Sequence, residues 1–233
     1  MHSPPKEQGS TQRWIFFILI GGLIAIGILF VLSRFVDYFG PQLIKSPYST
    51  ETTEREVEIA GIQFLVPENM IRFEEQRNQY QLKQLDLVML WPDFIGFNRE
   101  QQIEFSDTSD QSNLVFVSIS QPAEVISSSD RLFTVYSQYF DGKPTKGPAT
   151  LIGFSMSKDS GFDGETIYFK PDSTEPFVAR CIEERDGNPA ICMRDIAWGD
   201  EIQVSYRFRP HLLKNWQRLD HTLLLKLSEL LVK

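Results

Sequence analysis

Histidine and cysteine are scarce in this sequence, which has three histidines and two cysteines among 233 residues. His2 is near the start, while His211 and His221 stand ten residues apart in one amphipathic segment. On a helix, that spacing leaves them nearly three turns apart on different sides, so they share no metal ion without a further ligand. Ser–His and Cys–His catalysis have little to draw on, and a glycine-rich phosphate-binding loop is missing. We therefore predict no catalytic, metal or cofactor-binding residues and expect that the protein is not an enzyme.

An excess of basic residues is also missing. The formal net charge is −8, from 23 Lys and Arg against 31 Asp and Glu. Lys6, Glu7 and Arg13 are the only charged residues before residue 34. Residues 34–233 therefore hold 21 basic and 30 acidic side chains, a net charge of −9. An acidic domain has no general attraction for nucleic acid, and anionic lipid headgroups repel it. We exclude nucleic acid as a partner and expect basic or neutral partners.

Charge and proline are both absent from residues 14–32, WIFFILIGGLIAIGILFVL. These 19 residues would cover about 28 Å as a helix, close to the roughly 30 Å of a hydrocarbon core. Trp14 and Phe35 stand near the two edges, where interfacial aromatic residues are enriched. The alternative is a cleavable signal peptide, but its apolar region is shorter, and the small-residue site that should follow is replaced by SRF. We predict an uncleaved transmembrane anchor at residues 14–33.

Lys6 and Arg13 precede the span, and Arg34 and Lys45 follow it. Because the basic residues are equal in number on the two sides, the positive-inside rule does not decide the orientation. Residues 1–13 are too few to fold, so we predict a cytoplasmic head there and translocation of the longer part. Residues 34–56 are mostly polar and include prolines, which predicts a juxtamembrane linker. Residues 57–233 then form one extracytoplasmic domain, long enough to bury a core.

This domain is rich in apolar runs of strand length, namely residues 57–67 (two short strands), 85–91, 113–120, 150–156, 165–170, 177–182, 191–196 and 202–208. In the last run, IQVSYRF, apolar and polar residues alternate. That pattern predicts a strand with one buried face and one wet face, which carries Gln203, Ser205 and Arg207.

Two segments have helical spacing instead. Residues 130–140 carry an apolar stripe with Ser129 as a candidate N-cap, and Pro210 opens a long C-terminal helix. The apolar stripe of that helix is two columns wide and comprises Leu212, Leu213, Trp216, Leu219, Leu223, Leu224, Leu227, Leu230 and Leu231. Such a width suits a helix that covers a sheet. Consecutive strands with late helices predict an α+β fold, a mainly antiparallel sheet covered by helices.

The two cysteines stand close together in the sequence. If Asp186-Gly187 forms a two-residue turn, Cys181 lies opposite Cys192 in a β-hairpin. The pair is then a disulfide candidate in an oxidising compartment, and two buried thiols are the alternative. A bridge there would support an extracytoplasmic domain, because cytosolic thiols are kept reduced.

The same hairpin places Arg180 diagonal to Asp195, among apolar neighbours. One hypothesis is an electrostatic binding site. We favour the other, a structural ion pair between Arg180 and Asp195, because structural pairs of this kind are common.

Six stretches resemble a set of membrane-anchored proteins of alphaproteobacteria: IAGIQFLVPENMIRFEEQRN, LDLVMLWPDFIGF, FVARC, CMRDI, GDEIQVSYRF and LLKNWQRLD. They are spread over residues 59–220, so the resemblance covers most of the chain. The resemblance implies a single-pass protein of the inner (plasma) membrane with its C-terminal domain in the periplasm, and it implies no chemistry. We therefore predict a membrane-tethered periplasmic protein for protein interaction or envelope assembly, without catalytic activity and with other envelope proteins as partners. The alternative is a periplasmic domain that binds a small molecule or a lipid.

Overall fold

The computed structural model describes residues 9–43, 47–171 and 173–232. The chain forms two compact units, Met1–Ser46 and Pro47–Lys233. In the first, α1 (Gly9–Leu43) is a helix of 35 residues whose segment Phe17–Arg34 is long and apolar enough to cross a membrane. Most of the predicted head, residues 1–13, lies outside the described residues. The helix extends about ten residues beyond the predicted end of the anchor, into the predicted linker.

The second half of the predicted linker belongs to the folded domain, which starts at Pro47 rather than near residue 57. The ring of Tyr48 lies 5.7 Å from that of Phe97 and 5.6 Å from that of Phe105. The Ser49 hydroxyl donates a hydrogen bond of 2.7 Å to Glu68. These partners are distant in sequence, so the polar composition that predicted a linker could not reveal them. Residues 44–46 lie outside the described residues.

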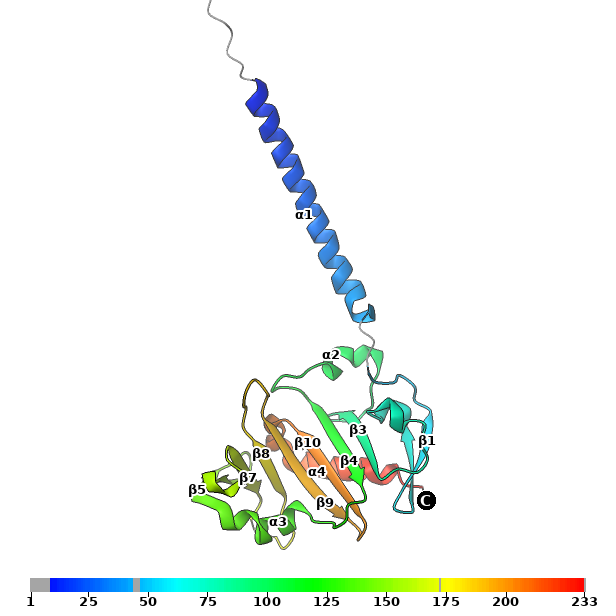
Figure 1. Cartoon of the computed structure of the whole chain (residues 1–233), viewed down its shortest axis with the longest axis vertical. Coiled ribbons are helices and arrows are strands. Elements are labelled where there is room, and N and C mark those ends of the chain that lie inside the picture. Colours follow the sequence, from blue (N-terminus) through cyan, green and yellow to red (C-terminus); the bar gives the residue numbers. More distant parts are fainter. Residues whose placement is uncertain (1–8, 44–46, 172, 233) are drawn as a thin grey trace, which may run out of the picture. The chain divides into compact units, whose positions relative to one another are not determined.

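The domain is an α+β fold built on an eight-stranded antiparallel sheet, which confirms the predicted fold class (Figure 1). The strand order is β3-β4-β10-β9-β8-β7-β6-β5. The bounds are β3 (Gln84–Leu90), β4 (Leu114–Ser120), β5 (Phe140–Lys146), β6 (Ile152–Met156), β7 (Glu165–Phe169), β8 (Val178–Ile182), β9 (Ile191–Trp198) and β10 (Ile202–Phe208). A separate hairpin joins β1 (Glu54–Ile59) to β2 (Ile62–Pro67). The helices of the domain are α2 (Gln102–Phe105), α3 (Ser128–Thr134) and α4 (Trp216–Glu229), and short 3-10 turns include η4 (Tyr136–Tyr139) and η6 (Pro210–Asn215).

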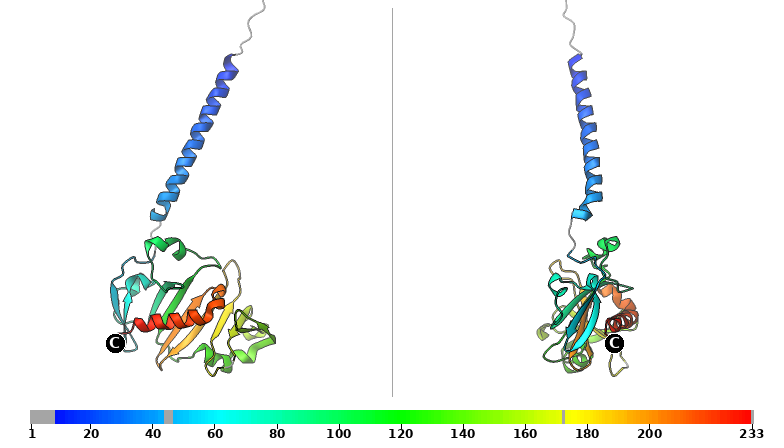
Figure 2. Two further views of the ribbon diagram at one scale, coloured as in Figure 1. Left: turned by 180° about the vertical axis from the view of Figure 1, so that it is seen from behind. Right: turned by 90° about the vertical axis from the view of Figure 1, so that its right-hand side faces the viewer.

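The main core lies between the sheet and α4, which crosses one face of it (Figure 2). The predicted leucine stripe of the C-terminal helix is confirmed. Leu219, Leu223 and Leu227 are fully buried, and Trp216 is half-buried with its ring 4.6 Å from that of Phe177. Burial of each such leucine is worth about 1.5–3 kcal/mol relative to exposure, so this face fixes α4 to the sheet.

A buried polar network also joins α4 to the sheet. Arg194 of β9 donates to the Asp220 carboxylate of α4 at 3.0 Å from Nε, and the Tyr206 hydroxyl of β10 donates to it at 2.7 Å. Burial and the Asp220 carboxylate raise the pKa of Tyr206 well above its usual value. Tyr206 therefore stays protonated and keeps donating, which ties both strands to the helix.

The helix predicted at residues 130–140 is shorter and starts earlier. Ser127, not Ser129, is its N-cap, in a capping box with Asp130. The helix α3 ends at Thr134, a turn of 3-10 helix follows, and Phe140 begins β5. The ring of Phe140 stacks on that of Phe154 in β6 at 4.3 Å, so pairing with the next strand overrides the helical spacing.

Candidate functional site

Polar side chains gather on the sheet face opposite α4, which we call the polar face. It comprises Asp86 on β3, Phe116 and Ser118 on β4, Gln203, Ser205 and Arg207 on β10, and Met193 and Asp195 on β9. The alternation of residues 202–208 predicted this wet face. The burial pattern confirms it, since Val204 and Tyr206 are fully buried while Arg207 is exposed.

Four residues of the polar face form one row across four strands. Ser118 is the register partner of both Asp86 and Ser205, and Ser205 is the partner of Asp195. The Ser118 hydroxyl donates to Asp86, and the Ser205 hydroxyl donates to Asp195 at 2.5 Å. Each serine thus supplies a donor to the carboxylate beside it, so the row is an ordered element of the sheet.

Asp86 is buried, with 6% of its surface exposed, and its donors are neutral. The side-chain amide of Gln76 donates to it at 3.0 Å and that of Gln84 at 2.9 Å. The Asp86 backbone N–H donates in return to the Gln76 side chain at 2.9 Å. These bonds hold the segment around Gln76 against β3, and they satisfy the carboxylate without an ion pair.

Asp195 anchors α3 at the other side of the polar face. Its carboxylate pairs with Arg131 of α3, and its backbone N–H donates to the Ser128 hydroxyl at 2.8 Å. The pair is partly buried, with 30% of the Arg131 side chain and 16% of the Asp195 side chain exposed. The row is therefore bounded by α3 beyond β9 and by the Gln76 segment beside β3.

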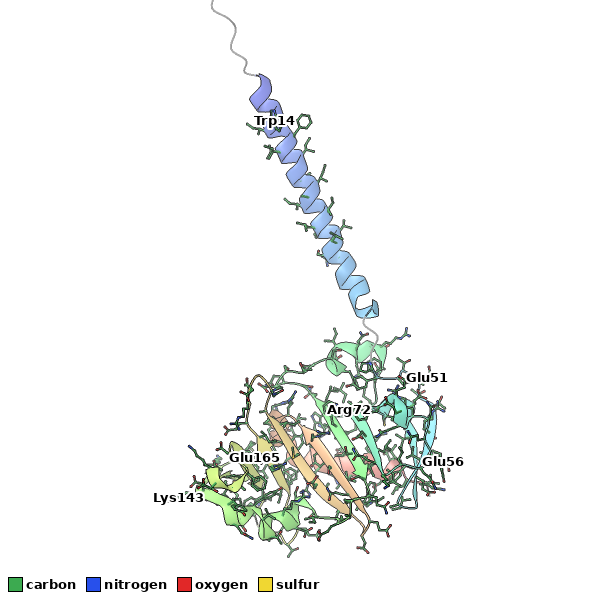
Figure 3. The ribbon with its side chains drawn as sticks, in the orientation of Figure 1. Trp14, Glu51, Glu56, Arg72, Lys143 and Glu165 are labelled. Carbon is green, nitrogen blue, oxygen red and sulfur yellow. A yellow bond between two sulfur atoms is a disulfide. The ribbon has the colours of Figure 1, made fainter. Side chains whose placement is uncertain are left out.

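The ion pair predicted between Arg180 and Asp195 is wrong. Arg180 pairs instead with Glu165 of β7, which is labelled in Figure 3, at 2.9 Å, while Asp195 pairs with Arg131. Both acids and both arginines are thus paired, but with partners from β7 and α3. The hairpin pattern alone could not show that β7 lies beside β8 or that α3 covers β9.

Two arginines beside the row lack such partners. The guanidinium of Arg72 lies 4.9 Å from the ring centre of Phe73 and 4.7 Å from that of Phe116. Arg207 is the register partner of Phe116 from β10 and is exposed. Within the described part of the chain, no carboxylate is in ion-pair contact with either guanidinium.

A cavity of about 120 Å³ adjoins Phe116 and Arg207. Its walls are mostly apolar and include Tyr48, Phe105, Leu114, Ile191 and Phe208. Burial raises the pKa of Tyr48, against the opposing charge of Arg72. The sequence pattern did not predict that these segments lie side by side. Of the cavity residues, only Arg207 was indicated by the sequence, as a residue on the wet face of an alternating strand.

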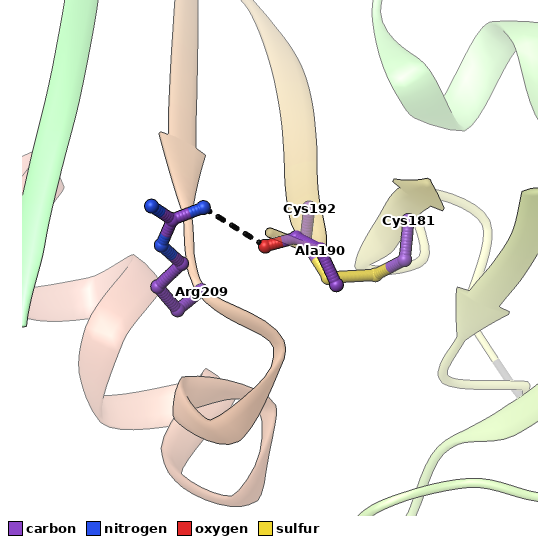
Figure 4. Close-up of a disulfide and its surroundings, with 4 residues drawn as sticks. All are labelled: Cys181, Ala190, Cys192 and Arg209. Carbon is purple, nitrogen blue, oxygen red and sulfur yellow. Dashed lines mark hydrogen bonds between the residues drawn. A yellow bond between two sulfur atoms is a disulfide. The ribbon is translucent and has the colours of Figure 1, made fainter. Parts of the chain in front are cut away.

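The cavity wall is braced by Arg209 and by the disulfide (Figure 4). Arg209 donates to the carbonyl oxygens of Ala190, at 3.1 Å, and Thr108, at 2.8 Å. Cys181 and Cys192 are register partners, as the predicted turn at Asp186-Gly187 required, and a disulfide joins them. Ile191, in the cavity wall, stands between Ala190 and Cys192, so both links restrain it.

A second hollow, of about 510 Å³, lies between residues 121–125 and the turn from β9 to β10. Its polar lining includes Glu124, Asp200 and Glu201. Over residues 9–43, 47–171 and 173–232, no group of three or more His, Cys, Asp or Glu side chains is placed to hold a metal ion.

Comparisons with known proteins give a fold. No protein-family model matches the chain, and no curated protein matches it. Among solved structures, it is similar to Smlt3025, an immunity protein of the Stenotrophomonas maltophilia type IV secretion system. The TM-score is 0.54 at 12% identity, over 78% of this chain and 95% of that one. A second similarity, to the Neisseria meningitidis iron-regulated outer membrane lipoprotein FrpD, has a TM-score of 0.43 at 10% identity, over 70% and 84%. The likeness to Smlt3025 shows a shared fold.

Proposed function

We propose that the chain is a membrane-anchored protein whose periplasmic domain binds another protein through the polar face, without catalysis of its own. The observation that carries this proposal is the state of the charges on that face. The carboxylates of Asp86 and Asp195 are satisfied internally, whereas the guanidinium groups of Arg72 and Arg207 have no acidic partner among the described residues. Arginine and aromatic side chains are enriched at the centres of protein interfaces.

The proposed topology rests on the anchor and the disulfide. The helix α1 supplies a span of suitable length and composition. A disulfide between Cys181 and Cys192 persists in an oxidising compartment, which supports a periplasmic domain. The resemblance to alphaproteobacterial anchored proteins supports the inner membrane as the site of the span. The shared fold with an immunity protein of a secretion system supports, at the level of architecture, a role at the cell envelope.

The alternative function, binding of a small molecule or lipid, has less support. Sites for such ligands usually have volumes of about 300–1,000 Å³ and mainly apolar walls. The cavity beside Phe116, at about 120 Å³, is too small for a whole ligand. The hollow of about 510 Å³ is large enough, but three carboxylates, Glu124, Asp200 and Glu201, are part of its lining.

Photo-crosslinking of the full chain in its native membrane tests the proposal. A photoreactive residue replaces Ser120 on β4 or Phe73, which is 41% exposed and lies beside Arg72, and it replaces Leu225 or Lys143 as exposed controls elsewhere. We expect crosslinks to one protein from the polar face and few or none from the controls, followed by saturable binding of that purified protein to the purified chain. Crosslinks to no protein from Ser120 and Phe73, or equal yields at Leu225, would overturn it.

A further inference from the structure

Arg72 and Arg207, which have no ion-pair partner among the described residues, form a local cationic patch on an acidic domain. Residues 34–233 carry a net charge of −9, and the other arginines of the polar side, Arg131 and Arg180, each pair with a carboxylate. Arg72 and Arg207 both adjoin Phe116, one stacked over its ring and one opposite it in the strand register. A guanidinium offers donors in a fork that matches a carboxylate, so this patch fits an anionic group from outside the chain.

The adjoining cavity fits one apolar side chain. Its volume is about 120 Å³, and most of its surface comes from apolar atoms of residues such as Tyr48, Phe105 and Leu114. An apolar cavity of about 150 Å³ admits benzene, so this one holds an aliphatic or small aromatic side chain. Arg207 and Arg209 also line the cavity, together with Asp107. An apolar side chain in the cavity therefore lies next to the cationic patch, whereas the Asp107 carboxylate disfavours a second carboxylate inside the cavity itself.

The cavity is also preorganised. The disulfide at Cys192 and the bonds from Arg209 to Ala190 and Thr108 join three separate segments at its wall. His211 adds a link, since its Nδ1 lies 3.0 Å from the Asp110 carbonyl oxygen and its Nε2 lies 3.1 Å from Asn113 Oδ1. A site whose walls are already fixed loses little conformational entropy when it is filled.

We infer that this cavity receives one apolar side chain of the partner protein, and that Arg72 and Arg207 bind a carboxylate next to that side chain. The inference rests on the proposed function and names the recognition element, an acidic residue beside an apolar one in an exposed segment. The small volume favours a protein side chain over a whole small molecule. An apolar anchor in a pocket beside a desolvated charge pair is the usual form of an interface hot spot.

A displayed library of random twelve-residue peptides, selected on the full chain in lipid nanodiscs, provides the probe. We expect enrichment of acidic residues next to leucine or phenylalanine. The selected peptides, fluorescently labelled, are then titrated against variants by fluorescence anisotropy. Arg207→Gln should weaken binding about tenfold or more, because a charge-assisted hydrogen bond is lost. Arg218→Gln, an exposed arginine over the ring of Trp91, is the matched control and should change affinity less than about twofold.

Filling the cavity gives a second, independent test. Ile191→Trp places a large side chain at its half-buried wall and should abolish peptide binding, whereas Ile103→Trp, at a residue that is 83% exposed on α2, should leave it unchanged. If the unfolding midpoints of all variants equal that of the parent, misfolding is excluded as the cause of a loss of peptide binding. The inference would be overturned if no selected peptide bound more weakly to both the Arg207→Gln and the Ile191→Trp variant than to the parent.

Two further outcomes separate this inference from the proposed function. If the crosslinked partner binds the chain but is insensitive to Arg207→Gln and Ile191→Trp, the inference is wrong and the proposed function stands. Phenylacetate, which combines a ring with a carboxylate, serves as a small-molecule competitor. If phenylacetate alone binds as tightly as the peptides, the occupant is a small acid, and the protein side chain is refuted.

Discussion

Replacing Asp220 by alanine should destabilise the domain by roughly 3 kcal/mol. Asp220 is the only carboxylate in ion-pair contact with Arg194 among the described residues, and it also accepts from the Tyr206 hydroxyl. The Arg194 side chain is only 11% exposed, so its charge would be left without a counterion inside the protein. Breaking one partner of a buried pair costs about 3–5 kcal/mol. Because 17% of the Asp220 side chain is exposed, we expect the lower end of that range.

Two companion variants separate the charge from the contact. Tyr206→Phe removes one hydrogen bond and leaves the ion pair, so it should cost about 1 kcal/mol. The double variant Arg194→Met with Asp220→Leu replaces both charges by apolar side chains of similar length. Such replacements are often neutral, so the double variant should be clearly more stable than Asp220→Ala.

Guanidinium unfolding of the full chain in a nonionic detergent, followed by tryptophan fluorescence, measures these differences. Thermal unfolding should agree, since about 3 kcal/mol corresponds to a fall of about 6–12 °C in Tm for a domain of this size. If the unfolding free energy of Asp220→Ala lay within about 1 kcal/mol of the parent's, the Arg194 charge would not depend on Asp220, and the reasoning would be refuted. A double variant as unstable as the single one would show that packing, not the orphaned charge, sets the cost.

Three further predictions concern the same domain. The Cys181–Cys192 disulfide joins residues with a sequence separation of 11, and its reduction should lower the unfolding free energy by up to about 3 kcal/mol. Thiol labelling of native membranes should modify both cysteines only after reduction. Gly96→Ala should cost about 1–3 kcal/mol in the same unfolding assay, because its Cβ would lie 2.9 Å from the backbone carbonyl carbon of Asn69; a parental midpoint would contradict this. Burial lowers the pKa of His211, so its contribution to stability is present above its ordinary pKa of about 6.5 and lost as pH falls through the folded value. Unfolding midpoints between pH 8 and pH 5 should therefore decline less steeply in His211→Gln than in the parent, and identical slopes would show that another group titrates.

Local patterns in the sequence predicted much of the fold. The alternation of residues 202–208 identified a strand with a wet face, and that face carries the candidate site. A turn at Asp186-Gly187 placed Cys181 opposite Cys192, as the register shows. Both inferences use spacing within one hairpin or one strand, where backbone geometry alone decides which side chains share a face.

Where the sequence misled, the deciding contacts come from distant segments. The strand β5, FDGKPTK, has little strand character, because Gly142, Pro144 and two lysines suit an exposed edge. It forms because β6 pairs with it on one side. Arg131 and Asp195 stand 64 positions apart, so no local pattern could favour that ion pair over Arg180 with Asp195.

The polar face shows why the state of each charge, rather than its presence, indicates function. The fold supplies Asp86 and Asp195 each with hydrogen-bond donors, so these carboxylates stabilise the sheet and have little capacity left for a ligand. Arg72 and Arg207 keep their donors, because no carboxylate among the described residues is in ion-pair contact with either guanidinium. Desolvating these two guanidinium groups against an apolar partner would be costly, so a surface that includes them can be covered favourably only by a partner that brings its own carboxylate. The same two side chains that would strengthen binding of the acidic segment proposed above would therefore weaken binding of a neutral or basic one, and this difference would give the proposed interaction its specificity.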